Sequence, residues 1–166
     1  MNKRGDLTGV IFLIASVGAF AIFLLIVGYV VPLISNELVT QIGISPEINN
    51  SLNVGISVAE HTLPTLWLIM FVGSMLGVFI TSYFIDTHPV FVPAFVILLI
   101  VAILVAIPIS NAYEQLSETA IFTSTSIQQT IVFFMMTNLP FLAFIIGLIS
   151  MIVAYAKPGY GGTTFA

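Results

Sequence analysis

Cysteine and charge are what this sequence most lacks. It contains no cysteine, and of its 166 residues only 3 are Lys or Arg and 7 are Asp or Glu. A chain without cysteine has no disulfide framework, no thiolate nucleophile and no zinc site built on thiolates. Three basic residues, Lys3, Arg4 and Lys157, do not make the positive patch that nucleic-acid binding requires. We therefore expect no nucleic-acid partner.

Apolar residues take the place of the missing charge. They make up 59% of the chain and the mean hydropathy is +1.18. Charged residues make up 6%, whereas soluble domains carry about 25%. Four apolar runs are each near the length of about 20 residues that a helix needs to cross a hydrocarbon core of about 30 Å. We predict an all-α polytopic integral membrane protein, a single membrane domain over 1–166, with spans at about 10–34, 63–85, 90–109 and 131–156.

The first polar segment, 35–62, predicts a short amphipathic helix outside the membrane. Ser45-Pro46-Glu47 is a typical helix start, with a capping serine, a proline at the first helical position and an acid in the first turn. Apolar residues then recur at helical spacing and form one stripe. We expect this helix to lie along the membrane surface or on the other helices.

The second polar segment, 110–130, predicts a clearer amphipathic helix. Asn111 and Glu114 form a capping-box-like start, and apolar residues follow at helical spacing against a face of Ser, Thr, Gln and Glu. The segment has no Lys or Arg to attract it to anionic lipid. We expect it to pack as an extramembrane extension or to contact a partner.

Prolines mark the expected ends of the spans and one expected bend. Pro64 is predicted to open the second span, and Pro108 to lie in the last turn of the third. The segment Asp86-Thr87-His88-Pro89 is predicted to turn the chain between these two spans, which would form a helical hairpin. Pro140 lies a few residues inside the fourth span and predicts a kink there or a new helix start.

Two glycines and three larger side chains are the candidate contact residues. Gly73 and Gly77 form a GxxxG element near the middle of the second span. This spacing lets helix backbones approach closely, either within the chain or with another subunit. In the second polar segment the candidate partner contacts are Tyr113, Leu116 and Ile127.

Nothing in the sequence points to a reaction. Every ionisable residue lies at a span end or in a polar segment, whereas proton relays and charged transport sites place such residues within spans. The histidine–carboxylate pairs are Glu60 with His61 and Asp86 with His88, and the predicted topology puts them on opposite sides of the membrane. We therefore expect no enzyme, with no catalytic residue, no cofactor, no metal ion and no small-molecule substrate.

Charge also predicts the orientation. Lys3 and Arg4 precede the first span and are expected on the cytoplasmic or interior side. Four spans return Lys157, and with it the C-terminus, to that side. The same threading places five acids on the outer side: Glu37, Glu47, Glu60, Glu114 and Glu118. Aromatic residues near the span ends are expected to anchor the protein at the lipid–water interface: Tyr29, Trp67, Tyr83, Tyr113 and Tyr155.

Two resemblances bear on the class of protein. The opening Lys3-Arg4-Gly5-Asp6 before an apolar helix resembles the class III leader of archaeal pilins and archaellins, which implies cleavage near the glycine. The first span itself is longer than the apolar core of a secretory signal peptide and lacks the small-residue cleavage site that would follow one, so we expect it to be retained. In composition the whole chain resembles small integral membrane proteins of membrane-containing phages and viruses.

Three functions follow as hypotheses, in order. The first is a non-catalytic membrane structural or assembly subunit that binds other membrane or capsid-type proteins, in a virion or in a larger membrane complex. The second is a small oligomeric channel or holin-like pore, whose wet path would be lined by Ser74, Thr137, Asn138 and Ser150. The third is a pilin-like subunit.

Overall fold

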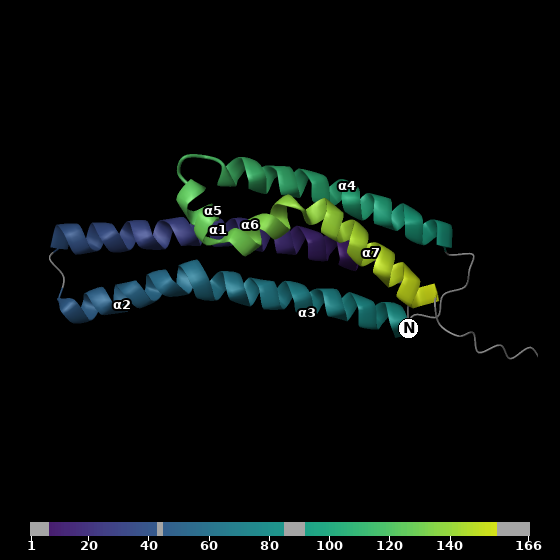
Figure 1. The fold of residues 1–166 in the computed structure, drawn as a ribbon, viewed down its shortest axis with the longest axis horizontal. Helices are drawn as coiled ribbons and strands as arrows, with labels where there is room; N and C mark the ends of the chain where they lie inside the picture. Colours follow the sequence, from purple (N-terminus) through teal and green to yellow (C-terminus); the bar gives the residue numbers. More distant parts are fainter. Residues whose placement is uncertain (1–6, 43–44, 85–91, 156–166) are drawn as a thin grey trace, which may run out of the picture.

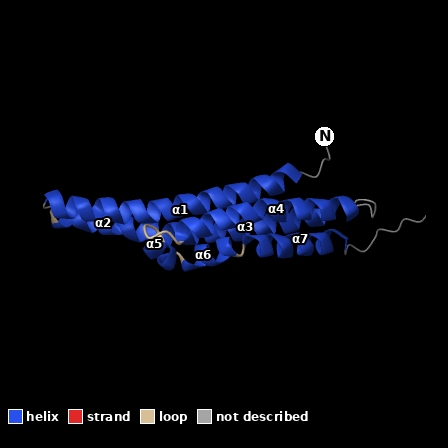
Figure 2. Cartoon of the chain, turned by 90° about the horizontal axis from the view of Figure 1, so that it is seen from above, coloured by secondary structure: helices blue, strands red, loops and turns tan. Residues whose placement is uncertain are grey.

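A computed structural model describes residues 7–42, 45–84 and 92–155 (Figure 1). All of its elements are helices, as predicted, and no strand occurs in this described part of the chain (Figure 2). In chain order they are α1 (Leu7–Ile42), α2 (Pro46–Ser57), the π-helix η1 (Val58–Thr62), α3 (Leu63–Phe84), α4 (Val92–Ser117), α5 (Thr123–Gln128), α6 (Thr130–Thr137) and α7 (Leu139–Tyr155).

Four helices form a bundle. α1 contacts both α3 and α4, and α7 also contacts both, so the order around the bundle is α1, α3, α7, α4. α3 and α4 therefore lie on opposite sides of α1 and α7 rather than forming a closely packed hairpin (Figure 1). α1 begins and α7 ends at the same end of the bundle (Figure 1). The turn predicted at 86–89 lies outside the described residues.

At the other end α1 and α2 extend past the remaining helices as a two-helix arm (Figures 1 and 2). We define the arm as α2 together with residues 35–42 of α1. The helix start at Ser45 is confirmed: Pro46 is in the first turn, and the Asn49 N–H donates to the Ser45 carbonyl at 3.1 Å. The predicted cap is not, because the Ser45 side chain makes no capping hydrogen bond. The sequence predicted that this helix lies either along the membrane surface or on the other helices. The structure has the second arrangement, because α2 packs on α1.

Pro64 lies within a continuous helical column and does not open a helix, so that prediction is wrong. α2, η1 and α3 follow one another without a break. Proline has no N–H for the carbonyl four residues earlier, which here belongs to Glu60. The π-helix accommodates this defect because the Leu63 N–H donates to the carbonyl of Val58, five residues earlier. The change from polar to apolar sequence is thus a change within one helix.

Pro108 does not end α4 either, and Asn111 with Glu114 do not start a new helix. α4 continues to Ser117 because one buried face persists through the proline. The predicted single helix over 110–130 is therefore wrong: its first third belongs to α4, a turn follows, and α5 begins at Thr123. The buried face of α4 recurs at spacings of three and four residues: Ala102, Ala106, Ser110, Tyr113 and Ser117.

The bend predicted near Pro140 is confirmed. α6 ends at Thr137 and α7 starts at Leu139, and their axes differ by 71°. Three helical stretches are long and apolar enough to cross a membrane, namely Ile14–Gln41, Glu47–Phe84 and Val92–Ser117, and the bent pair makes a fourth if it counts as one span. This set of long apolar helices is compatible with an integral membrane protein.

The interior of the bundle is mainly apolar and includes two residues predicted to lie at the lipid interface. Trp67 and Tyr113 are both buried, so neither is in a position to anchor the chain in lipid. Trp67 stacks on Phe71 and its Nε1–H donates to the Val17 carbonyl at 3.4 Å. Around them the core is formed by Ile14, Ala21, Leu24, Leu25, Ala102, Ala106, Val132, Met136 and Leu139.

Candidate functional site: a polar junction at the α5–α6 break

The most unusual polar group in the bundle is Gln129, at the break between α5 and α6. Its backbone departs from helical geometry, with φ −92° and ψ 41°, which turns the side chain into the bundle. Gln129 is only 2% exposed, and its Nε2–H donates to the Leu24 carbonyl of α1 at 3.1 Å. Its Oε1 is buried and has no hydrogen-bond partner in the described part of the chain. Buried amide oxygens are usually paired, so this acceptor needs an explanation.

Gly28 provides the space for this side chain. A Cβ at position 28 would lie 2.5 Å from Gln129 Nε2 and 2.7 Å from Thr125 Cγ2. Real Cβ atoms essentially never make contacts that short, so glycine lets α1 and the α5–α6 junction approach closely, and a larger residue would force the ends of the Gln129 and Thr125 side chains to shift. The close approach in turn brings the Gln129 amide within reach of the Leu24 carbonyl.

Serine hydroxyls connect α5 and α6 to α4. Ser110 Oγ–H donates to the Thr137 carbonyl of α6 at 3.0 Å. Ser126 Oγ lies 2.9 Å from the Thr123 carbonyl and 3.4 Å from the Ser117 carbonyl, so its hydroxyl bridges α5 and the end of α4. In an apolar surrounding such side chain to backbone bonds hold helices in register. These bonds therefore hold α5 and α6 against α4.

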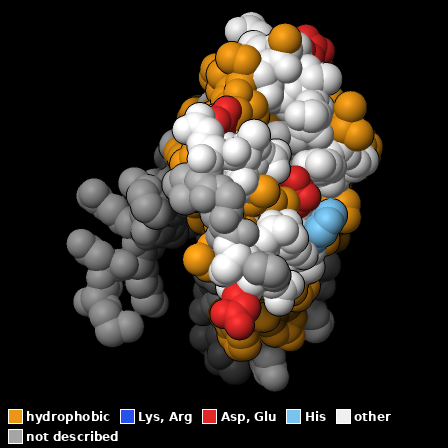
Figure 3. All heavy atoms as spheres, turned by 90° about the vertical axis from the view of Figure 1, so that its left-hand side faces the viewer, with side chains coloured by type: hydrophobic (Ala, Val, Ile, Leu, Met, Phe, Trp, Pro, Cys, Tyr) orange, Lys and Arg blue, Asp and Glu red, His pale blue; other side chains and the backbone are white. Residues whose placement is uncertain are grey.

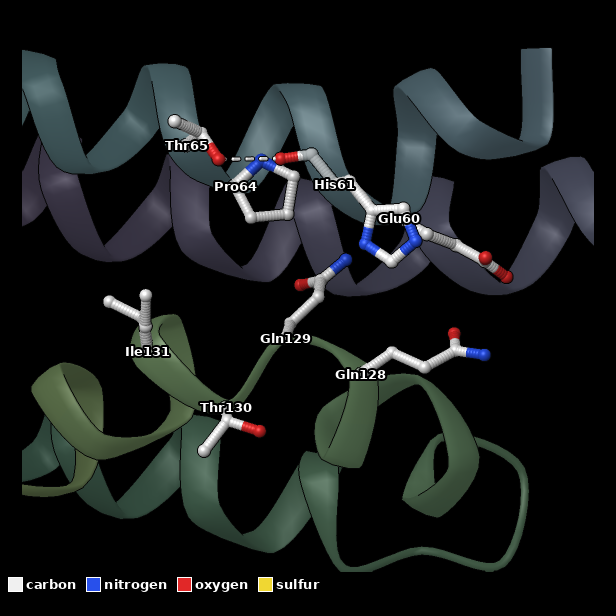
Figure 4. A pocket seen from close by; sticks show the side chains of 8 residues that line it. All are labelled: Glu60, His61, Pro64, Thr65, Gln128, Gln129, Thr130 and Ile131. Atoms are coloured by element: carbon white, nitrogen blue, oxygen red, sulfur yellow. Dashed lines mark hydrogen bonds between the residues drawn. The ribbon is translucent and has the colours of Figure 1, made fainter. Parts of the chain in front are cut away.

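An open pocket of about 260 Å³ lies between η1 and the junction. Figure 4 shows the His61 ring on one wall and the Gln129 amide on the other, while the Glu60 carboxylate and the Gln128 amide extend away from the gap between these two. Pro64, Thr65, Thr130 and Ile131 complete the lining. The pocket thus combines one carboxylate, one imidazole, two amides and two hydroxyls with an apolar edge.

The threonine hydroxyls of the lining are bonded within their own segments. The Thr65 hydroxyl donates to the His61 carbonyl at 2.7 Å, and the Thr130 hydroxyl donates to the Ile127 carbonyl at 2.6 Å. Neither hydroxyl proton is directed to a base that would activate it as a nucleophile. Among the described residues no group of three or more His, Asp or Glu side chains gathers to hold a metal ion. The second histidine–carboxylate pair, Asp86 with His88, lies outside the described residues.

The glycines of the predicted packing element do not pack within the chain. Gly73 and Gly77 are exposed on α3, and nothing lies within 4 Å of a Cβ built on either. The close helix contacts use other glycines: Gly18 against Ile109, Gly28 against Gln129, and Gly147 against Leu99. Sequence analysis missed these three. For Gly18 and Gly28 the sequence did hold a signal, a row of small and apolar residues at spacings of three and four. The structure buries this whole row on α1: Gly18, Ala21, Leu25 and Gly28.

The three predicted partner contacts have different environments. Tyr113 is fully buried in the bundle, so it has no surface to offer another protein. Leu116 is half-buried against the core. Ile127 is 69% exposed, and of the three it is the residue that remains accessible to a partner.

The end of the molecule that carries the arm is acidic. Figure 3 looks onto this end and shows acidic side chains, one histidine and scattered apolar side chains on its surface. Residues 7–42, 45–84 and 92–155 contain no Lys or Arg, and all of their acids lie on the arm, on η1 or near the end of α4. The acidic residues are Glu37, Glu47, Glu60, Glu114 and Glu118.

Comparison of the chain with protein-family models, with curated proteins and with solved structures finds no match.

Proposed function

We propose that the chain is a non-catalytic integral membrane subunit that spans the bilayer four times and binds another protein through its arm. The observation that carries the proposal is length. α1 has 36 residues and the column Glu47–Phe84 has 38, which at 1.5 Å per residue is about 54 and 57 Å. A hydrocarbon core is about 30 Å thick. Two helices of this length, packed side by side, extend well beyond the membrane and carry a surface into the aqueous phase.

The surface of the arm supports a protein partner. Val39, Ile48 and Val54 are exposed on it although it carries the polar part of the sequence. Exposed apolar residues with a polar surround are typical of protein interfaces. Glu37 and Glu47 add negative charge, so the complementary partner surface is apolar and basic. A phage or virus particle that contains a membrane is one assembly in which such a subunit would connect the membrane to a protein shell.

The proposed orientation follows the charges. The five described glutamates lie at the arm end, and α1 begins and α7 ends at the opposite end. With the basic residues Lys3, Arg4 and Lys157 on the cytoplasmic or interior side, the arm and its acids face outward. The α6–α7 pair provides the fourth span in this arrangement.

The test is purification from native membranes in mild detergent, followed by native mass determination. We expect a stoichiometric complex with a different protein. The double variant Ile48→Arg with Val54→Arg should reduce the bound partner at least about tenfold, because interface centres tolerate no buried unpaired charge. The control is Asn50→Arg with Asn53→Arg, which adds the same charge to α2. A partner-free homo-oligomer from wild-type membranes would contradict the proposal.

A pore is the second candidate, and one observation favours it. α6 and α7 are bent by 71°, and one buried polar atom beside the bend, Thr137 Oγ1, has no partner in the described part of the chain. Broken helices with free polar groups line ion and substrate paths in other membrane proteins. Ion leak from liposomes that contain the purified chain would support a pore, and tight liposomes would exclude it.

The pilin-like hypothesis rests on residues 3–6, which lie outside the described residues. It predicts cleavage near Gly5. The intact mass of the purified chain tests it directly, because loss of the first residues changes the mass by several hundred daltons. A mass that includes Met1 would remove this hypothesis.

A further inference from the structure

We propose that the partner bound by the arm is an amphipathic helix with basic residues, and that it packs lengthwise along one row of α2. The inference rests on the proposed function and adds the face, the secondary structure and the charge of the contact. The row consists of Ile48, Ser51, Gly55 and Val58, at spacings of three, four and three residues. These are the a and d spacings of a helix that packs along another helix.

The row is a second packing face of α2, and no described element covers it. α2 packs on α1, and its partly buried apolar side chains, Leu52 and Ile56, belong to a different row. With about 3.6 residues per turn, the two rows point roughly 100° apart around the helix axis. Ile48 is 52% and Val58 is 39% exposed, and nothing lies within 4 Å of a Cβ built on Gly55. A partner helix would therefore lie beside α2 without displacing α1.

The side chains of the row fit a helix with large apolar residues. Ile48 and Val58 lie at its ends, and the small residues Ser51 and Gly55 lie between them. The Ser51 hydroxyl donates to the Glu47 carbonyl at 3.2 Å, so its proton is bonded within α2. The row extends over ten residues, about 15 Å along the axis. A partner helix with large apolar side chains opposite the small residues would bury the whole row.

Charge favours a basic partner over a second copy of this chain. Glu47 is exposed directly before the row, and the described residues contain no Lys or Arg to offset it. The imidazole of His61 faces the α5–α6 junction instead (Figure 4). Two copies in one membrane have parallel arms, which brings their Glu47 carboxylates to the same height, and like charges oppose association. A partner helix with Lys or Arg at this height forms an ion pair there.

The test is a cysteine footprint of α2, which is possible because the chain has no cysteine of its own. Labelling by a membrane-impermeant maleimide is compared in native membranes, where the partner is present, and in proteoliposomes of the purified chain. We expect native membranes to slow labelling on the row about tenfold, as for a row covered about nine-tenths of the time. Labelling on the opposite face should not change. The variants on the row are Ile48→Cys, Ser51→Cys, Gly55→Cys and Val58→Cys, and those on the opposite face are Asn53→Cys and Ser57→Cys.

The outcomes of the footprint separate this inference from the proposed function. Protection spread evenly over all six positions, or confined to Asn53 and Ser57, would show that the arm binds its partner through another surface. That result would overturn the helix on this row and leave the proposed function standing. Equal labelling in both preparations at every position would contradict both. Slow labelling of the row in proteoliposomes as well would identify a second copy and overturn the basic partner.

Two pairs of variants test the fit and the charge by the amount of partner retained in mild detergent. Gly55→Leu fills the middle of the row without a clash in the described chain, so retention should fall about tenfold while the fold is kept. Asn53→Leu adds the same side chain to the opposite face and should retain the partner. Glu47→Lys should also lower retention about tenfold, whereas Glu118→Lys near the end of α4 should not. Full retention in Gly55→Leu would overturn the packed helix, and full retention in Glu47→Lys would overturn its basic charge.

Discussion

The two ends of the molecule are built differently. In the bundle, α1, α3, α4 and α7 enclose a common core, and polar contacts such as Gln129 to Leu24 connect helices far apart in the sequence. In the arm, α2 packs on α1 alone, apart from its own continuation into η1. Its hydrogen bonds are local, such as the Gln41 amide to the Glu37 carboxylate at 2.8 Å within one helix. The bundle therefore supplies stability, and the arm supplies surface.

This difference predicts that equal changes have unequal effects in the two regions. A side chain that fills space or removes a polar bond in the bundle should lower the free energy of unfolding. A comparable change on the arm should leave folding unchanged and alter binding only.

The largest expected effect on stability is at Gly28. Gly28→Ala would place a methyl group against Gln129 and Thr125, and overpacking of this kind costs about 1–3 kcal/mol. Gly73→Ala is the matched control, because nothing lies within 4 Å of its Cβ. Denaturant titration of both variants in one detergent measures the difference. Equal stability of the two variants would show that α1 does not approach the junction as closely as described.

The next largest effect is at Gln129 itself. Gln129→Leu would remove the bond to the Leu24 carbonyl and should cost about 1 kcal/mol, in the range of polar bonds between membrane helices. Gln128→Leu serves as the control, since that neighbouring side chain is exposed. Denaturant titration of both variants in one detergent measures the difference in the free energy of unfolding. A Gln129→Leu variant more stable than wild type would mean that burying Oε1 without a partner costs more free energy than the bond from Nε2 to the Leu24 carbonyl contributes.

Ser110 should show a smaller effect. Ser110→Ala would remove the bond from α4 to the Thr137 carbonyl, at a cost of about 0.6 kcal/mol. Ser74→Ala is the comparison, because its hydroxyl bonds only within its own helix, to the Met70 carbonyl at 2.8 Å. If the two variants unfold at the same denaturant concentration, the interhelical bond contributes nothing measurable.

The smallest effect on stability is expected on the arm. Ile48 is exposed, so Ile48→Arg should change the free energy of unfolding by no more than about 0.5 kcal/mol. Its influence should be confined to the partner assay. A loss of stability as large as that of Gly28→Ala would show that the arm has a core of its own, and the contrast between the two regions would fail.

Sequence reasoning predicted the helices better than their ends. The helical class, the start at Ser45 and the bend near Pro140 follow from local chemistry and are confirmed. Pro64 and Pro108 were misread because proline removes one hydrogen bond, and packing over the rest of the helix can compensate for that loss. At Pro64 a π-helix also reroutes the bonding. Local sequence does not report such tertiary compensation.

The candidate site was less predictable, for a related reason. A segment rich in Ser, Thr and Gln suggests a solvated surface, yet Gln129, Thr125 and Ser126 are buried. The packing of Gln129 and Thr125 depends on Gly28, which lies about a hundred residues earlier in the sequence. No periodicity within 110–130 encodes that contact. The exposed GxxxG of α3 shows the converse, since a motif that permits close packing does not by itself supply the partner.

The most direct test of the central claim is the accessibility of the arm. Because the chain has no cysteine, single substitutions Val54→Cys on the arm and Leu76→Cys on α3 can be labelled selectively with a membrane-impermeant maleimide. In proteoliposomes exposed to reagent on both sides we predict rapid labelling at 54 and none at 76. In native membranes labelling at 54 should be slow, because the partner covers it. An unlabelled position 54 in proteoliposomes, or equal labelling in both preparations, would contradict an extramembrane arm that binds another protein.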